Sequence, residues 1–259
     1  MARYDFGATR LFVEADLRSG ARLPVGADRA NFLLNVLRLK AGDRLLAFNG
    51  RDGEWRATLI EAKKRDAVLQ IDERARPQEQ GPDIDYCFAP LKHARLDYVV
   101  QKAVEMGASR LRPIVTRRTQ VSRLNLERMR ANVVEAAEQC GVLRVPTVEP
   151  ETPIERLVAQ WPEDRLLVFC DEDAGISDPI AALRAAAAGR PARAGVVIGP
   201  EGGFDEKERS LLLSVPAAVR ISLGPRILRA DTAAVAALAL VQTVLGDWSN
   251  LPPSDTILP

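Results

Sequence analysis

The spacing of apolar residues changes about seventy residues into the chain. Before that point, three short apolar runs are separated by Asn-Gly, Asp-Gly and a charged turn, a pattern typical of β-hairpins. The runs are Leu45–Asn49, Glu54–Ile60 and Ala67–Ile71. Asn31–Leu39 is predicted to form a short helix that ends before Gly42. Residues 1–74 are therefore expected to form a small, mostly antiparallel β domain, and the Pro- and Gln-containing stretch 75–83 a linker.

From Ile84 onward, strand-like runs alternate with helix-like segments. The predicted strands are Ile84–Ala89, Leu111–Thr116, Leu166–Cys170, Val196–Ile198 and Val219–Leu223. Between them lie apolar residues at helical spacing, such as those from Leu96 to Val104, those from Leu126 to Ala137, Pro179–Ala188 and Thr232–Leu245. Asp205 followed by Glu208 indicates a capping box that begins another helix. Such alternation predicts an α/β domain over residues 84–250, with a parallel sheet covered on both faces, and residues 251–259 are left as a tail.

The last predicted helix is apolar on nearly every side, from Ala233 to Val241. A helix of this kind is buried on more than one face. It lies either in the core or against a second copy of the protein, and we favour the contact between copies.

Bulk composition excludes several classes of protein. The N-terminus has no apolar stretch typical of a secretory signal, and the longest apolar run is too short to cross a bilayer. The three cysteines are odd in number and widely spaced, as in a reduced cytoplasmic protein. With only one histidine, His93, no histidine-based metal site and no Ser-His-Asp triad with a choice of bases can be drawn, so no metal is expected.

The net charge of +1 hides an uneven distribution. Between Arg110 and Arg130, five arginines accompany a single acid, Glu127, whereas Glu151–Arg209 is acidic. A local arginine cluster suits a surface that meets phosphates. A solvated face is an equally good interpretation of this stretch by itself.

Two glycine-rich segments carry most of the candidate chemistry. Ile198–Phe204 and Leu223–Thr232 each follow a predicted buried strand, and loops at the carboxyl ends of parallel strands form ligand sites. Neither contains the lysine of a phosphate-binding loop nor a dinucleotide fingerprint. Glu201 would repel a phosphate but would suit a hydroxyl-rich or cationic ligand, such as the ribose and sulfonium of S-adenosylmethionine. A tight turn with Glu201 in solvent is the alternative.

Taken as a pair, Gly199-Pro-Glu-Gly-Gly-Phe204 and Leu223-Gly-Pro-Arg-Ile-Leu-Arg229 resemble the knotted methyltransferases often called SPOUT. Within them the chain is most similar to the bacterial 16S ribosomal RNA uridine-N3 methyltransferase family, RsmE. Further co-linear matches are Asn35-Val-Leu-Arg-Leu39, Gly42-Asp43, Phe48-Asn-Gly50, Gln101–Gly107, Pro113, Arg117-Arg118, Glu135–Gly141 and Val145-Pro146. The chain departs from the family at Asn31-Phe32, at Val142, and at Arg229-Ala-Asp-Thr232, where the family commonly has Arg-Thr-Glu-Thr.

This resemblance implies a SPOUT-type α/β fold with a deep C-terminal trefoil knot, preceded by a PUA-like RNA-binding β-barrel. It also implies a homodimer in the cytoplasm that methylates N3 of a uridine in 16S rRNA of the small ribosomal subunit, with S-adenosylmethionine as cofactor. Other SPOUT methylations of rRNA or tRNA, including ribose methylation, and a non-catalytic rRNA-binding role are the alternatives. An NAD- or nucleotide-dependent enzyme is disfavoured because no phosphate loop is present.

Individual residues receive roles on the same basis. Cofactor-binding positions are Gly199, Pro200, Glu201, Gly202, Gly203, Leu223, Gly224, Arg226, Ile227 and Leu228. Arg229 is expected to stabilise charge on the base, and Asp231 or Glu201 to take its proton. The alternatives are that Arg229 pairs with Asp231 or Glu201, and that Asp231 is the N-cap of the last helix. RNA is expected to bind Arg10, Asn35, Arg38, Arg117 and Arg118, although Arg38 could equally brace the barrel.

Overall fold

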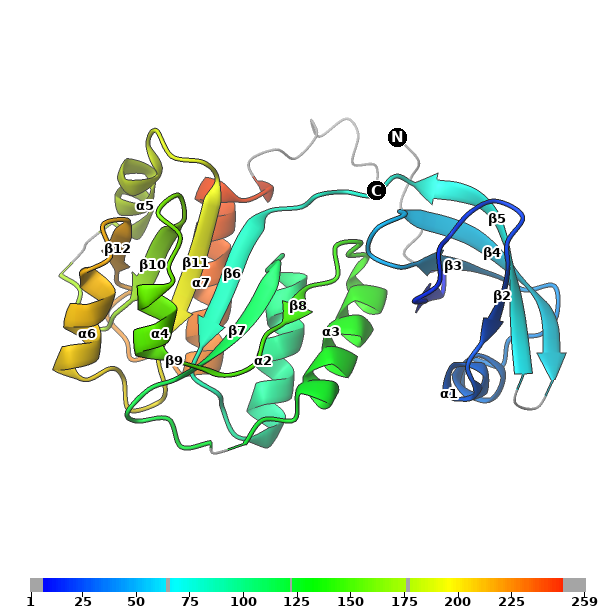
Figure 1. Cartoon of the computed structure of the whole chain (residues 1–259), viewed down its shortest axis with the longest axis horizontal. Helices are drawn as coiled ribbons and strands as arrows, with labels where there is room; N and C mark the ends of the chain where they lie inside the picture. The colour runs from blue at the N-terminus through cyan, green and yellow to red at the C-terminus, as the bar shows by residue number, and fades with distance from the viewer. Residues whose placement is uncertain (1–6, 64–65, 122, 176–177, 249–259) are drawn as a thin grey trace. The chain divides into compact units, whose positions relative to one another are not determined.

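The computed structural model describes residues 7–63, 66–121, 123–175 and 178–248. The chain divides into two compact units, Met1–Gln80 with Ala137–Val145, and Gly81–Ala136 with Pro146–Pro259 (Figure 1). The assignment of 137–145 to the first unit was not predicted. The predicted linker, 75–83, overlaps a strand at each end, and the predicted tail, 251–259, lies outside the described residues.

The first unit contains a five-stranded sheet in the order β1-β3-β4-β5-β2. Its strands are β1 (Arg10–Phe12), β2 (Arg22–Val25), β3 (Arg44–Phe48), β4 (Glu54–Lys63) and β5 (Asp66–Arg76). β1 lies parallel to β3, and the other neighbouring pairs are antiparallel. The alternating inward side chains of these strands build a separate apolar core, so the predicted hairpins are confirmed.

The helix of the first unit begins and ends earlier than predicted. It consists of α1 (Ala27–Asn31) continued by a π-helical turn, η1 (Phe32–Val36). Arg38 has a φ of 59°, in the left-handed region where glycine is usual. The Leu39 N–H then donates to the Leu33 carbonyl at 2.9 Å, which satisfies a carbonyl group near the end of the helix. The helix therefore ends at an arginine in a strained conformation and not near Gly42.

The second unit contains a wholly parallel sheet in the order β12-β10-β11-β6-β7-β8, with β9 beside β7. The strands are β6 (Asp83–Phe88), β7 (Arg110–Val115), β8 (Thr147–Val148), β9 (Thr152–Pro153), β10 (Leu166–Cys170), β11 (Arg193–Ile198) and β12 (Ala218–Ile221). The helices are α2 (His93–Glu105), α3 (Leu126–Cys140), α4 (Ile154–Ala159), α5 (Pro179–Ala187), α6 (Glu206–Leu213) and α7 (Ala230–Leu245). The end of α3 belongs to the first unit. The predicted α/β class is confirmed, while β8, β9 and α4 are too short to have left a periodic signal.

Helices cover both faces of this sheet. α7 packs on β11 beside α2 and α5, and α4 packs against α6 in front of the strands (Figure 1). Ala234, Leu238 and Val241 of α7 are fully buried in this contact. Burial in the core thus explains the apolar residues on one side of α7. The contact of α7 with a second copy of the protein stays a prediction. The trefoil knot also stays a prediction.

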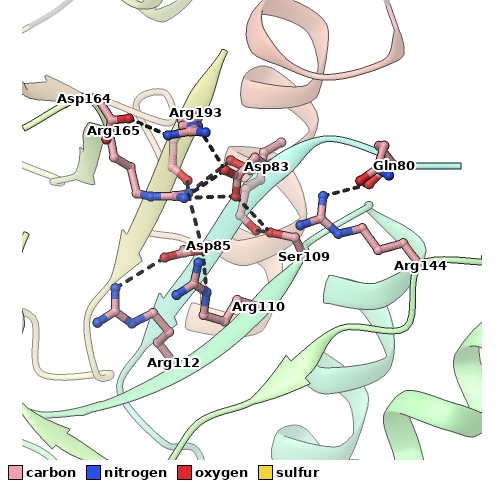
Figure 2. Close-up of polar contacts among 12 residues, drawn as sticks. Gln80, Asp83, Asp85, Ser109, Arg110, Arg112, Arg144, Asp164, Arg165 and Arg193 are labelled. Carbon is pink, nitrogen blue, oxygen red and sulfur yellow. Dashed lines mark hydrogen bonds and ion pairs between the residues drawn. The ribbon is translucent and has the colours of Figure 1, made fainter. Parts of the chain in front are cut away.

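A network of ion pairs holds the sheet at the edge where its strands begin (Figure 2). The Arg165 guanidinium donates to both carboxylate oxygens of Asp83, at 2.9 and 3.0 Å, and to the Ala194 carbonyl at 3.0 Å. Buried Asp85 lies 3.2–3.4 Å from guanidinium nitrogens of Arg110, Arg112 and Arg165. Burial raises the pKa of Asp85, and the three arginines offset only part of that effect. These contacts join β6, β7, β10 and β11.

Candidate functional site

The loops that follow three neighbouring strands form a pocket at the carboxyl edge of the parallel sheet. β10 lies between β11 and β12, and all three run in the same direction, so the segments after them meet. Of the ten predicted cofactor-binding residues, nine line this pocket: Gly199, Pro200, Glu201, Gly203, Leu223, Gly224, Arg226, Ile227 and Leu228. The sequence-based expectation that the two glycine-rich segments share one pocket is confirmed.

The first of these loops can fold tightly because two of its glycines lack side chains. A Cβ at Gly199 would lie 2.8 Å from the Phe204 ring, which packs edge-on against Phe169 at 5.2 Å between centroids. Gly203 has a φ of +70°, and its N–H donates to the Pro200 carbonyl at 2.8 Å. The backbone of this loop is thereby exposed to the pocket, where its polar groups can approach a ligand closely.

A third loop, after β10, was missed by sequence reasoning. Cys170, Asp171 and Glu172 line the pocket, as does Arg209 of α6. The segment has no glycine or proline signature. The available signal was topological, because Leu166–Cys170 was itself predicted as a parallel strand with a carboxyl end at the same edge. Burial raises the pKa of the Cys170 thiol to about 12, so at neutral pH this side chain is not a nucleophile.

Glu201 lies in the pocket wall and is not directed only at solvent. One of its carboxylate oxygens lies 3.5 Å from a guanidinium nitrogen of Arg95 in α2, and both side chains are nearly half exposed. Gly202, the tenth predicted position, does not line the pocket, and its carbonyl accepts a hydrogen bond from Arg118 instead. Glu201 and Gly202 are the central residues of a tight turn closed by the Gly203–Pro200 hydrogen bond, as in the alternative, and the exposed Glu201 also lines the pocket.

Arg229 and Asp231 lie on either side of the first residue of α7. Arg229 is the N-cap residue and its exposed side chain lines the pocket, whereas Asp231 does not line it. Asp231 accepts from the Thr232 N–H at 2.8 Å and is the second residue of the helix, so the N-cap alternative is wrong. Among the described residues no ion pair joins Arg229 to Asp231 or to Glu201, which leaves the guanidinium of Arg229 available to a ligand.

Of the two arginines that follow β7, Arg118 contacts the glycine-rich loop and Arg117 contacts the start of α6. Arg117 is 74% exposed, and its guanidinium lies 3.2 Å from a carboxylate oxygen of Asp205. Its backbone N–H donates to Glu208, which with Asp205 forms the predicted capping box of α6. Together with Arg95, these residues place several guanidinium groups beside the Glu201 segment of the pocket rim.

The predicted RNA-contacting residues of the first unit differ in their availability. Asn35 and Arg38 are both exposed. Arg10 is only 5% exposed, and each of its guanidinium nitrogens is engaged: Nε with Glu54 at 2.6 Å, Nη1 with Glu138 at 3.0 Å and Nη2 with Val142 at 3.1 Å. The prediction that Arg10 contacts RNA is wrong, because its guanidinium is buried and already paired with groups inside the first unit.

Neither a metal centre nor a membrane span is found in the part of the chain that the structure describes. No group of three or more His, Cys, Asp or Glu side chains is arranged to hold an ion within residues 7–63, 66–121, 123–175 and 178–248. Within the same ranges, every helix is too short or too polar to reach across a bilayer.

Comparison with known proteins gives matches over both units. Residues 78–242 match the family model of an RNA methyltransferase domain, and residues 25–72 that of an RNA methyltransferase PUA domain. The ribosomal RNA small subunit methyltransferase E of Rickettsia conorii is 30% identical over 234 residues, which cover 90% of this chain and 94% of that protein. Its namesake in Synechocystis is 30% identical over 92% of this chain and 78% of that protein. The crystal structure of a Neisseria gonorrhoeae enzyme of the same name, bound to S-adenosylmethionine, has a TM-score of 0.81 and 26% identity, and the match covers 93% of this chain and 99% of that one.

Proposed function

Because the chain belongs to the ribosomal RNA small subunit methyltransferase E family, we propose that it methylates N3 of a uridine in 16S rRNA in the cytoplasm, with S-adenosylmethionine as methyl donor. The pocket built by three loops at the carboxyl edge of the parallel sheet is the observation that supports this function most directly. Gly199, Gly203 and Gly224 can present only backbone to this pocket, which suits an adenine held by main-chain hydrogen bonds.

The chemistry demands a cationic group beside the acceptor base. S-adenosylmethionine supplies an electrophilic methyl group on its sulfonium. N3 of uridine carries an imide proton and lies on the pairing edge, so the target must be unpaired or flipped out of its helix. As the proton leaves, negative charge spreads over N3 and the flanking carbonyl oxygens, where a fixed guanidinium lowers the barrier.

Arg229 is the residue proposed for that role, since it lines the pocket and lacks a carboxylate partner among the described residues. Glu201 and Asp231 are the candidate proton acceptors, and Glu201 is favoured because it lines the pocket and Asp231 does not. Arg229→Ala is expected to keep S-adenosylmethionine affinity while lowering kcat by a factor on the order of 10²–10³. Near-normal turnover in this variant would reject the catalytic role.

RNA is proposed to bind Asn35 and Arg38 of the first unit and Arg117 and Arg118 of the second. The guanidinium groups suit phosphate oxygens, and each phosphate contact adds to the salt dependence of binding. Arg117→Glu should weaken RNA binding and reduce the slope of log affinity against log salt concentration by about 1. An unchanged affinity and slope would place the RNA surface elsewhere.

The active form is proposed to be a homodimer, with the deep trefoil knot of the SPOUT fold at the pocket. Half-buried side chains of α7, such as Val235 and Leu240, leave an apolar surface that a second copy would cover. Light scattering of the purified protein measures the mass directly, and a monomer at micromolar concentration would reject this part of the proposal.

Two measurements test the function as a whole. Calorimetry with S-adenosylmethionine separates a methyltransferase from a non-catalytic rRNA-binding protein. Small-subunit RNA from a strain that lacks the enzyme is then incubated with protein and cofactor, and the modified nucleotide is mapped by mass spectrometry. Methylation at N3 of one uridine is the expected product, whereas a ribose methyl group would refute the proposed specificity.

A further inference from the structure

The geometry points to Glu172 as the residue that accepts hydrogen bonds from the ribose hydroxyl groups of the methyl donor. This inference rests on the proposed function, because it requires a nucleoside ligand in the pocket. Glu172 follows β10, and its loop lies between the loops that follow β11 and β12. It was not among the predicted site residues.

Three consecutive carboxylates occupy this loop, and only the middle one remains available to a ligand. Asp171 is buried and lies 2.7 Å from Arg220 and 3.4 Å from Arg209. Asp173 is paired with Arg209 and does not line the pocket. Glu172 does line it, its side chain is 56% exposed, and its nearest cationic nitrogen, on Arg209, is 3.7 Å away. Its oxygens therefore retain their acceptor capacity.

The Glu172 carboxylate reaches toward the glycine-rich loop. A Cβ built on Gly203 would lie 3.2 Å from Glu172 Oε1, so the carboxylate nearly touches the backbone of that loop. A nucleoside held by backbone groups of Gly199–Gly203 would bring its sugar within reach of this side chain.

Hydroxyl groups suit Glu172 as partners because its oxygens keep their acceptor capacity. The guanidinium of Arg209 is shared with Asp171 and Asp173, both closer to it than Glu172 at 3.7 Å, so it occupies little of that capacity. The lone pairs of Glu172 still accept hydrogen bonds from neutral donors, and a carboxylate on a ribose diol is the arrangement found in dinucleotide-binding folds.

The test is calorimetry on the full-length protein with four ligands. S-adenosylhomocysteine and 5′-methylthioadenosine both contain the ribose, and only the first carries the amino-acid end. The 2′-deoxy and 3′-deoxy forms of S-adenosylhomocysteine each lack one hydroxyl. Wild-type protein is expected to bind at least one deoxy form about tenfold more weakly than the parent, as for loss of a hydrogen bond to a charged group.

Glu172→Gln and Glu172→Ala should lower affinity for S-adenosylhomocysteine and methylthioadenosine by similar factors. In both variants, ribo and deoxy ligands should bind within about twofold of each other, because the partner of the hydroxyl is gone. Glu206→Gln, an exposed carboxylate change in the first turn of α6, serves as the matched control and should keep the wild-type preference. Circular dichroism melts confirm that each variant is folded.

Several results would overturn the assignment. They are equal wild-type affinity for ribo and deoxy ligands, a ribose preference that survives in Glu172→Ala, or a loss confined to the ligand with an amino-acid end. Wild-type protein that binds neither S-adenosylhomocysteine nor S-adenosylmethionine would instead refute the proposed function itself, so the two failures are distinguishable.

Discussion

Glu54 connects the separate segments that make up the first unit. It begins β4, is 1% exposed, and its two carboxylate oxygens accept from Arg10 Nε at 2.6 Å and from Arg76 Nε at 2.7 Å. Arg76 also donates to the Gly141 carbonyl at 2.9 Å, and Arg10 to the carbonyls of Glu138 and Val142. The carboxylate thus fixes two arginines that hold residues 137–145 against the sheet.

Replacing this carboxylate with an amide should be costly. Glu54→Gln preserves shape but leaves Arg10 buried without its counter-charge, and breaking a buried pair in this way costs about 3–5 kcal/mol. Glu73→Gln is the matched control, because Glu73 pairs with Arg56 at 2.7 Å but is 70% exposed. Loss of such an exposed pair costs under about 1 kcal/mol. Hydrogen exchange of β3, β4 and β5, followed by mass spectrometry, measures the stability of this unit by itself.

The difference between wild type and Glu54→Gln should also depend on pH. Burial by itself would raise the pKa of Glu54, but hydrogen bonds from Arg76 and Arg10 outweigh burial and hold it below the ordinary value of 4.5. A carboxyl group with a lowered pKa in the folded state stabilises the fold above its unfolded pKa, and this contribution is lost as pH falls through the folded value. The gap should therefore be constant from about pH 6 to 8 and narrow below about pH 4.5. A difference in the free energy of unfolding below about 1 kcal/mol at pH 7 would refute the reasoning. A difference that stays the same in acid would refute it as well.

Two further predictions concern the second unit. A Cβ at Gly195 would lie 2.2 Å from the buried Trp161 ring, so Gly195→Ala should lower the free energy of unfolding in urea by about 1–3 kcal/mol; Gly175→Ala, with open space around it, should not, and equal stability of the two variants would contradict this. At pH 8 a thiol reagent should modify exposed Cys140 rapidly and half-buried Cys170 slowly, because a pKa of about 12 leaves Cys170 almost no thiolate. Rapid labelling of both, read by peptide mass, would contradict the raised pKa of Cys170.

Local sequence patterns predicted the helices and strands of this protein well, but they predicted the contacts between distant segments less well. Hairpin turns, the capping box at Asp205 and the alternation of strands with helices are properties of neighbouring residues, and each is present in the structure. The joining of residues 137–145 to the first unit depends on contacts such as that of Arg10 with Val142, which lie 132 positions apart. No periodicity encodes such a pairing, and for the same reason Arg10 was taken for a surface residue.

The site followed the same division. Gly199–Gly203 and Leu223–Leu228 were found because a backbone that approaches a ligand needs glycine and proline, which stand out in a sequence. Glu172 was missed because no local sequence signal distinguishes one acidic residue after a strand from the other acidic residues of a chain that has 35. Its place became clear only when the strand order put β10 between β11 and β12.

The two ends of the parallel sheet perform different physical tasks, and the sequence carries this polarity. Charged residues stand where strands begin, as at Asp83, Arg110 and Arg193, and their ion pairs lock the amino edge. Gly199 directly follows β11, and because it has no side chain its backbone lines the pocket. Apart from Pro200 and Phe204, the loop after β11 buries no side chain through residue 204, so the strands beneath it must hold it in place. Loss of Asp83 should therefore weaken the pocket only by loosening the sheet, and a ligand that binds the pocket should recover part of that lost stability.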